Sequence, residues 1–205
     1  MTGYDLQRVR HRFTLWIAAG FVLTPIIGLG GALLFGLLDV PTLAAAGRAG
    51  ILPAMLAVLA GLSLIRFRAY LQPLLQWLAG HPDGGSAPTH LHRRLARFSR
   101  EYWGLFLLYA LATPVLLFAT AGGGFDRIPT EPLIHMVLLQ LTAAILVGLP
   151  TYLIALDLLG ELVAHMGLQQ VQVSLKSKIV LLGGLLPLLS YSALMQYHWL
   201  HGGGL

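Results

Sequence analysis

The chain has 205 residues, of which 57% are hydrophobic and only 10% are charged. Soluble domains carry about 25% charged residues, so this composition excludes an ordinary soluble domain and indicates a membrane protein. The net charge of +5 does not point to nucleic acid, because the basic residues are separated by apolar blocks and a nucleic-acid binder gathers them on one solvated face. The absence of cysteine excludes disulfides, thiolate zinc sites and a CxxCH haem attachment.

Five apolar blocks follow one another along the chain. Lipid cannot solvate backbone polar groups, so each block that crosses a bilayer must be a helix of about 20 residues. We therefore predict an all-α, polytopic membrane helix bundle, forming a single transmembrane sensory or anchor domain over residues 1–205. The predicted helices span about residues 13–38, 49–78, 90–121, 133–166 and 175–200. The segment 39–48 is predicted to be a loop, and Ala44-Ala-Ala46 within it is not interpreted as a cleavage site.

Positive charges mark one set of helix ends. These ends carry Arg8, Arg10, Arg12, Arg66, Arg68, Arg93, Arg94, Arg97, Arg100, Lys176 and Lys178. The opposite loops carry only Arg48 and Arg127. Because Lys and Arg are kept on the cytoplasmic side, we predict a multi-pass protein of the bacterial inner membrane with its N-terminus inside.

The apolar pattern continues inward beyond these arginines. It runs from Tyr70 to Gly80 after the second block and from Asp157 to Gly167 after the fourth, which predicts helices that extend several turns past the bilayer. Two interpretations stay open. The extensions form a cytoplasmic stalk that carries motion, or they are solvated helix ends beside lipid head groups.

The first two predicted hairpins share a pattern. Arg12 precedes an apolar helix with Thr24-Pro25, and Arg100 precedes one with Thr113-Pro114. If this is a repeat, the fifth helix begins a third unit whose partner, a sixth helix, is missing.

Two short motifs accompany the fifth helix, Ser174-Leu-Lys-Ser-Lys178 and Gly183-Gly-Leu-Leu-Pro187. With the two hairpins before them, they give an arrangement that resembles the six-helix, 6TM-HAMP type sensory module of bacterial receptors. In that family the sixth helix feeds a HAMP linker joined to a nucleotide cyclase, a diguanylate cyclase or phosphodiesterase, or a histidine kinase. The resemblance implies a homodimeric input module with a HAMP and output domain in the full-length protein. This chain has no sixth helix, HAMP segment or output domain, so it is either a fragment or a different five-helix protein.

Histidines are the residues best suited to a cofactor. At 1.5 Å per residue, His135 lies about 33 Å outward of Asp157 and His198 about 30 Å outward of Lys178, with His201 one turn further. Two imidazoles at matched depth can ligate a b-type haem or, with His201, a transition metal. We predict haem b on His135 and His198, with His201 as substitute. The alternative is that these rings are interface anchors.

A second pair of histidines is expected on the inner side. His92 and His165 lie about 12 Å inward of Arg100 and Asp157, so they are candidates for an inner ligand pair or for residues that simply face water or phosphate. His135 and His165 are about 45 Å apart along their helix, with no histidine between the interfaces. Electron transfer across the bilayer through two stacked haems is therefore poorly supported.

Enzyme motifs are missing: the sequence has no GxxxxGK[ST], HExxH or GxSxG, and we predict that the chain is not an enzyme.

The favoured function is a signal-transducing input module in which ligand binding or haem redox state shifts helices. A haem b electron-carrying cytochrome subunit is the first alternative. A small transporter or plain anchor is the second, although a transporter needs more midplane polar groups than Thr24, Thr113, Gln140 and Thr142.

Overall fold

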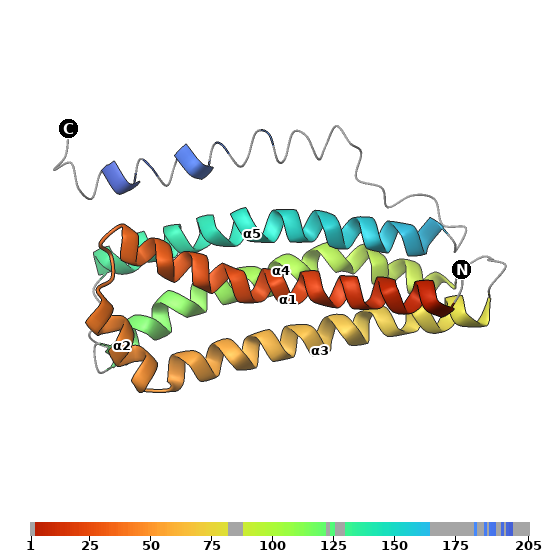
Figure 1. Ribbon diagram of the computed structural model, residues 1–205, viewed down its shortest axis with the longest axis horizontal. Coiled ribbons are helices and arrows are strands. Elements are labelled where there is room, and N and C mark those ends of the chain that lie inside the picture. Colours follow the sequence, from red (N-terminus) through yellow and green to blue (C-terminus); the bar gives the residue numbers. More distant parts are fainter. Residues whose placement is uncertain are drawn as a thin grey trace.

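Four long helices run side by side in the computed structural model (Figure 1). It describes residues 3–81, 88–121, 124–125 and 130–164, and single positions at 183, 187, 189–191, 194 and 196–198. The helices are α1 (Gly3–Leu34), α2 (Val40–Arg48), α3 (Ile51–Gly80), α4 (Thr89–Ala121) and α5 (Thr130–Ala164). No strand occurs in these residues, so the predicted all-α class is confirmed.

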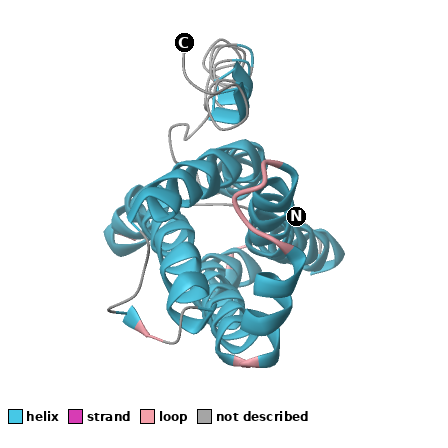
Figure 2. Cartoon of the chain, turned by 90° about the vertical axis from the view of Figure 1, so that its left-hand side faces the viewer, coloured by secondary structure: helices cyan, strands magenta, loops and turns pink. Residues whose placement is uncertain are grey.

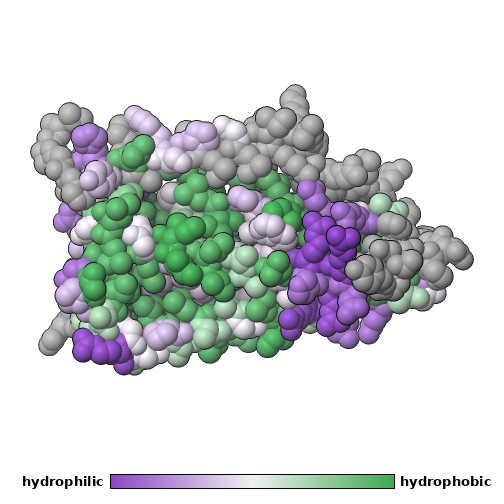
Figure 3. Space-filling model, viewed as in Figure 1, coloured by the Kyte–Doolittle hydropathy of each residue, from purple (hydrophilic) through white to green (hydrophobic). Residues whose placement is uncertain are grey.

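The four long helices, α1, α3, α4 and α5, are long and apolar enough to cross a membrane. With 30 to 35 residues each, they are about 45–52 Å long, which exceeds a hydrocarbon core of about 30 Å. Large aliphatic side chains such as Ile26, Val58 and Leu108 are exposed around the bundle, and Figure 3 shows an apolar surface over its middle. The predicted fifth helix, 175–200, falls largely outside the described residues.

The helices are arranged in a ring when the bundle is viewed from its end (Figure 2). Each long helix packs mainly on two neighbours: α1 on α3 and α5, and α4 on the same two helices. The α1–α5 contact is the most extensive and the diagonal α1–α4 contact is small. Long helices that follow one another in the described part of the chain are therefore neighbours in space.

Small residues explain the close α1–α5 packing. Gly20, Thr24, Gly28 and Ala32 recur every fourth residue on α1 and all are buried, and such small-xxx-small rows let membrane helices approach closely. A Cβ added at Gly20 would lie 3.0 Å from the hydroxyl oxygen of Thr151 on α5. The contact therefore depends on the absence of side chains.

Residues 40–48 form a helix, so the prediction of a loop over 39–48 was wrong. The Asp39 carboxylate caps α2 by accepting the backbone N–H of Thr42 at 2.8 Å, which satisfies an otherwise free donor. Ala46 is buried against the ends of the long helices. Hydrophobic contact and a cap therefore stabilise a helix of only nine residues.

The ends of α1 also differ from the predicted range 13–38. The helix begins at Gly3, because Val9 joins the core together with Phe13. It ends at Leu34, where Gly36 has a positive φ of 68° and the Leu37 N–H bonds to the Ala32 carbonyl at 2.9 Å. This is a Schellman turn, which requires a left-handed residue and therefore favours glycine.

Candidate functional site

His135 lies in the second turn of α5 and is partly buried. Its Nδ1 is 3.0 Å from the carbonyl oxygen of Glu131. A carbonyl can only accept a hydrogen bond, so Nδ1 is the donor in this contact and Nε2 is the ring nitrogen that remains for a metal. An N–H donated to a backbone carbonyl is the second contact that metal-ligating histidines commonly make.

His198 is exposed and belongs to the same end of the bundle as His135. The preceding Tyr197 packs on Phe35, with ring centroids 5.5 Å apart. Phe35 in turn packs against the buried cluster that contains Met136, the neighbour of His135. In the described part of the chain no three His, Asp or Glu side chains are grouped closely enough to hold a metal ion, so a site here would rest on two histidines.

The other predicted ligands are not placed by the structure. His201 and His165 lie outside the described residues, as does the side chain of His92, whose backbone is in α4. The proposed inner pair therefore remains a prediction.

The opposite end of the bundle, which we call the basic end, carries the arginines of α1, α3 and α4. Its polar surface is visible beside the apolar belt in Figure 3. Among the described residues the only ion pair joins Arg66 of α3 to Glu101 of α4, with Nε and Nη2 each 3.1 Å from the same carboxylate oxygen. The other arginines at this end form no ion pair with another described residue.

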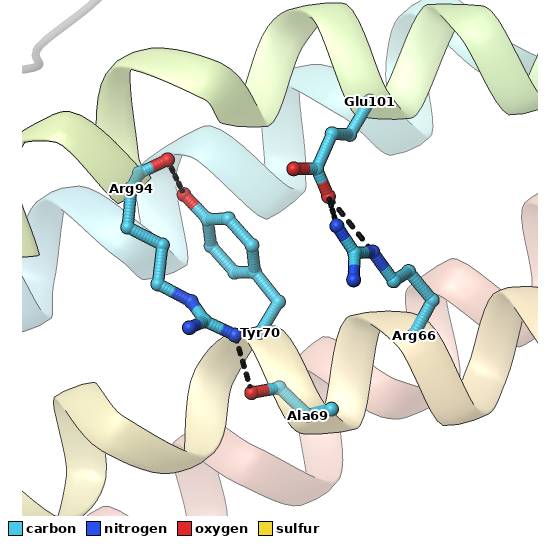
Figure 4. A network of polar contacts seen from close by, with 5 residues as sticks. All are labelled: Arg66, Ala69, Tyr70, Arg94 and Glu101. Carbon is cyan, nitrogen blue, oxygen red and sulfur yellow. Dashed lines mark hydrogen bonds and ion pairs between the residues drawn. The ribbon is translucent and has the colours of Figure 1, made fainter.

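A second contact between α3 and α4 links side chains to main chains (Figure 4). The Tyr70 hydroxyl donates to the carbonyl oxygen of Arg94 at 2.8 Å, and the Arg94 guanidinium donates to the carbonyl of Ala69 at 2.8 Å. The guanidinium carbon also lies 5.4 Å from the centre of the Tyr70 ring, within cation–π range. We call this reciprocal arrangement of Tyr70 and Arg94 the α3–α4 latch.

Sequence reasoning used these arginines only to orient the helices and missed the latch. The sequence offers one indication of the latch, which is that the aromatic Tyr70 lies close to Arg66 and Arg68 in α3. No spacing rule connects Tyr70 to Arg94, which is on another helix.

The basic end also has two hollows between helices. One, of about 330 Å³, lies between α3 and α4 and is lined by Arg66, Tyr70, His90, Arg93, Arg94, Arg97 and Glu101. The other lies between α1 and α3, and we call it the α1–α3 groove. It consists of two adjoining hollows of about 760 and 790 Å³ that share Gln7, Arg10, Thr14 and Arg68.

The polar residues in the middle of the bundle do not line a passage. Thr24, Thr113 and Thr142 each donate to the carbonyl four residues earlier in their own helix. Gln140 is fully buried, and neither atom of its amide has a hydrogen-bond partner. It packs so closely on Gly28 that an added Cβ there would lie 1.8 Å from its oxygen, so this amide has no room for a solute on that side.

The fold, the two ends of the bundle and the buried polar residues are thus defined by the structure alone. No protein family, curated protein or solved structure that was compared with the chain matches it.

Proposed function

We propose that the chain is the membrane input module of a bacterial signalling receptor, with its basic end in the cytoplasm. In this proposal it acts as a homodimer in the inner membrane, and a HAMP linker and output domain belong to the full-length protein. A stimulus acts on the end that carries His135, and helix movement carries the signal to the basic end.

One observation carries this proposal: the core continues without interruption into the basic end. Leu74 and Leu78 of α3, Leu91 and Leu95 of α4, and Leu162 of α5 are buried there in one cluster with the aromatic residues of the middle. Helix ends that are merely solvated would not share such a core. Because close-packed interiors transmit displacement, movement in the middle is passed on to the ends.

We further propose that the stimulus is a redox change at a haem b. His135 and His198 are the ligands, and His201 is the substitute. The free Nε2 of His135 supports this assignment, as does the position of Tyr197, next to His198, at the same end. A haem bound there would supply a one-electron redox change. The same features favour the second candidate, an electron-carrying cytochrome subunit.

The first test is an absorption spectrum of the purified protein, oxidised and then reduced with dithionite. We expect a Soret band with sharp reduced α and β bands that are lost or altered in His135→Ala and His198→Ala. His81→Ala is the matched control, because His81 also contacts the carbonyl four residues earlier but stacks on Trp77 at the basic end. A colourless wild type produced with ample haem would refute the haem assignment.

The second test separates the sensor from the electron carrier. The chain has no cysteine, so spin labels can be attached to Ala79→Cys and Ala164→Cys, both exposed at the basic ends of α3 and α5. A sensor should change the distance between the labels by about 1–2 Å on reduction, the size of typical helix shifts. An unchanged distance in a haem-loaded protein that quinol reduces reversibly would favour the cytochrome subunit.

A further inference from the structure

The ionisable side chains that line the α1–α3 groove are all basic. Arg8, Arg10 and His11 of α1 and Arg68 of α3 line it, and none of its described lining residues is acidic. Within the part of the chain that the structure describes, none of these arginines forms an ion pair. The hollow between α3 and α4 differs in this respect, because it contains Glu101 paired with Arg66.

The same groove becomes apolar toward the middle of the bundle. Leu15 and Ala18 of α1 and Leu64 and Ile65 of α3 are among its lining residues. Leu15 is 56% exposed and Ile65 67% exposed, so they face the surroundings of the bundle. One groove therefore presents cations and, on their side toward the middle of the bundle, exposed aliphatic side chains.

We propose that the α1–α3 groove binds an anionic phospholipid of the membrane leaflet at the basic end. Its phosphate lies between Arg10 and Arg68, which line both hollows of the groove, and an acyl chain lies on Leu15 and Ile65. Basic pockets between membrane helices are suited to such head groups. A free phosphate would contact only the arginines, and the aliphatic side chains of Leu15 and Ile65 would then have no ligand atoms to contact.

The proposal is tested by native mass spectrometry of the full chain in detergent, with phosphatidylglycerol and phosphatidylcholine of identical acyl chains. Each arginine near an anionic lipid contributes about fivefold in affinity. We therefore expect a preference for phosphatidylglycerol that falls about 25-fold in Arg10→Gln/Arg68→Gln and is retained in Arg10→Lys/Arg68→Lys. Binding of phosphatidylcholine should fall less, because its choline cation offsets the charge of its phosphate.

The matched control is Arg93→Gln/Arg97→Gln, which removes the same charge from the hollow between α3 and α4 and should leave the preference nearly intact. An equal loss in both glutamine pairs would mean diffuse attraction and would overturn the proposal. So would an absence of preference in the wild type. Displacement of the lipid by inorganic phosphate or glycerol phosphate at similar concentration would overturn it as well, because the groove would then be a site for a soluble anion. The wild-type competition and the lysine pair give a result even if the glutamine pair fails to fold.

Discussion

The ring of Phe106 provides the sharpest test of how the bundle is packed. This residue of α4 is fully buried between two glycines on different helices. A Cβ added at Gly148 of α5 would lie 3.1 Å from two atoms of the ring, and one added at Gly20 of α1 would lie 3.1 Å from a third. Phe21 limits movement further, with its ring centre 4.4 Å from that of Phe106. The ring therefore has little room to retreat from either side.

The change Gly148→Ala has two opposing effects. Alanine improves helix propensity by about 1 kcal/mol, whereas overpacking a tight core costs about 1–3 kcal/mol. Gly160 lies on the same helix, and an added Cβ there would meet nothing within 4 Å. Gly160→Ala therefore has the propensity gain alone. The free energy of unfolding should be about 1–3 kcal/mol lower for Gly148→Ala than for Gly160→Ala.

Unfolding in mixed micelles by increasing fractions of dodecyl sulfate, followed by circular dichroism, measures both variants. A smaller side chain at position 106 should relieve the strain, so Gly148→Ala combined with Phe106→Leu should show a coupling of about 0.5–3 kcal/mol in a double-mutant cycle. If Gly148→Ala is as stable as Gly160→Ala, the ring is not wedged between the glycines and the packing argument fails.

Three further changes test local contacts. Tyr70→Phe removes the donor to the Arg94 carbonyl and should lower the unfolding free energy by about 1 kcal/mol, and an unchanged value in the same micelle assay would contradict the latch. Tyr102→Phe removes a buried hydroxyl that bonds to the Gly148 carbonyl at 2.9 Å and should cost about 0.6 kcal/mol, as membrane hydrogen bonds do on average. Hydrogen bonds from Thr42 hold the pKa of Asp39 below its ordinary value, so the cap on α2 persists above that ordinary pKa and is lost as the pH falls through the lowered one. The protection factors of the α2 amides in hydrogen exchange should therefore fall in acid, whereas those of Asp39→Asn should be the same in acid and at neutral pH.

The class of the fold and the four described spans were predictable because backbone N–H and C=O groups in lipid must be hydrogen-bonded within the protein, which favours long apolar helices. The short helix α2 was missed although its signals are present: Asp39 is a favoured N-cap residue, and Pro41 suits the first turn. Its length of nine residues is marginal for an isolated helix, so contacts with the long helices decide the outcome. The early start of α1 has the same origin, because Val9 lies among arginines in the sequence and is buried only by its neighbours.

The candidate sites were less predictable than the fold. Helical depth placed His135 and His198 at one end of the bundle, but the tautomer of His135 needs the position of the Glu131 carbonyl. The latch joins residues 24 positions apart, and it depends on how α3 and α4 are rotated about their axes. Single-sequence periodicity reports which face of a helix is apolar, and it does not specify this rotation.

The contacts between neighbouring helices are not equally close on all sides of the bundle, and this difference connects the two proposals. The α1–α5 contact is extensive and made by small residues, while α3 and α4 are joined at the basic end by the latch and the Arg66–Glu101 pair. On another side of the bundle, α1 and α3 enclose two adjoining hollows of about 760 and 790 Å³. A shift of α1 relative to α3 at the basic end would therefore disturb few close contacts at the groove. It would, however, change the separation of Arg10 from Arg68. A lipid phosphate held by both arginines would stabilise one separation of α1 from α3, so in the proposed receptor a signal from the other end would have to act against that lipid.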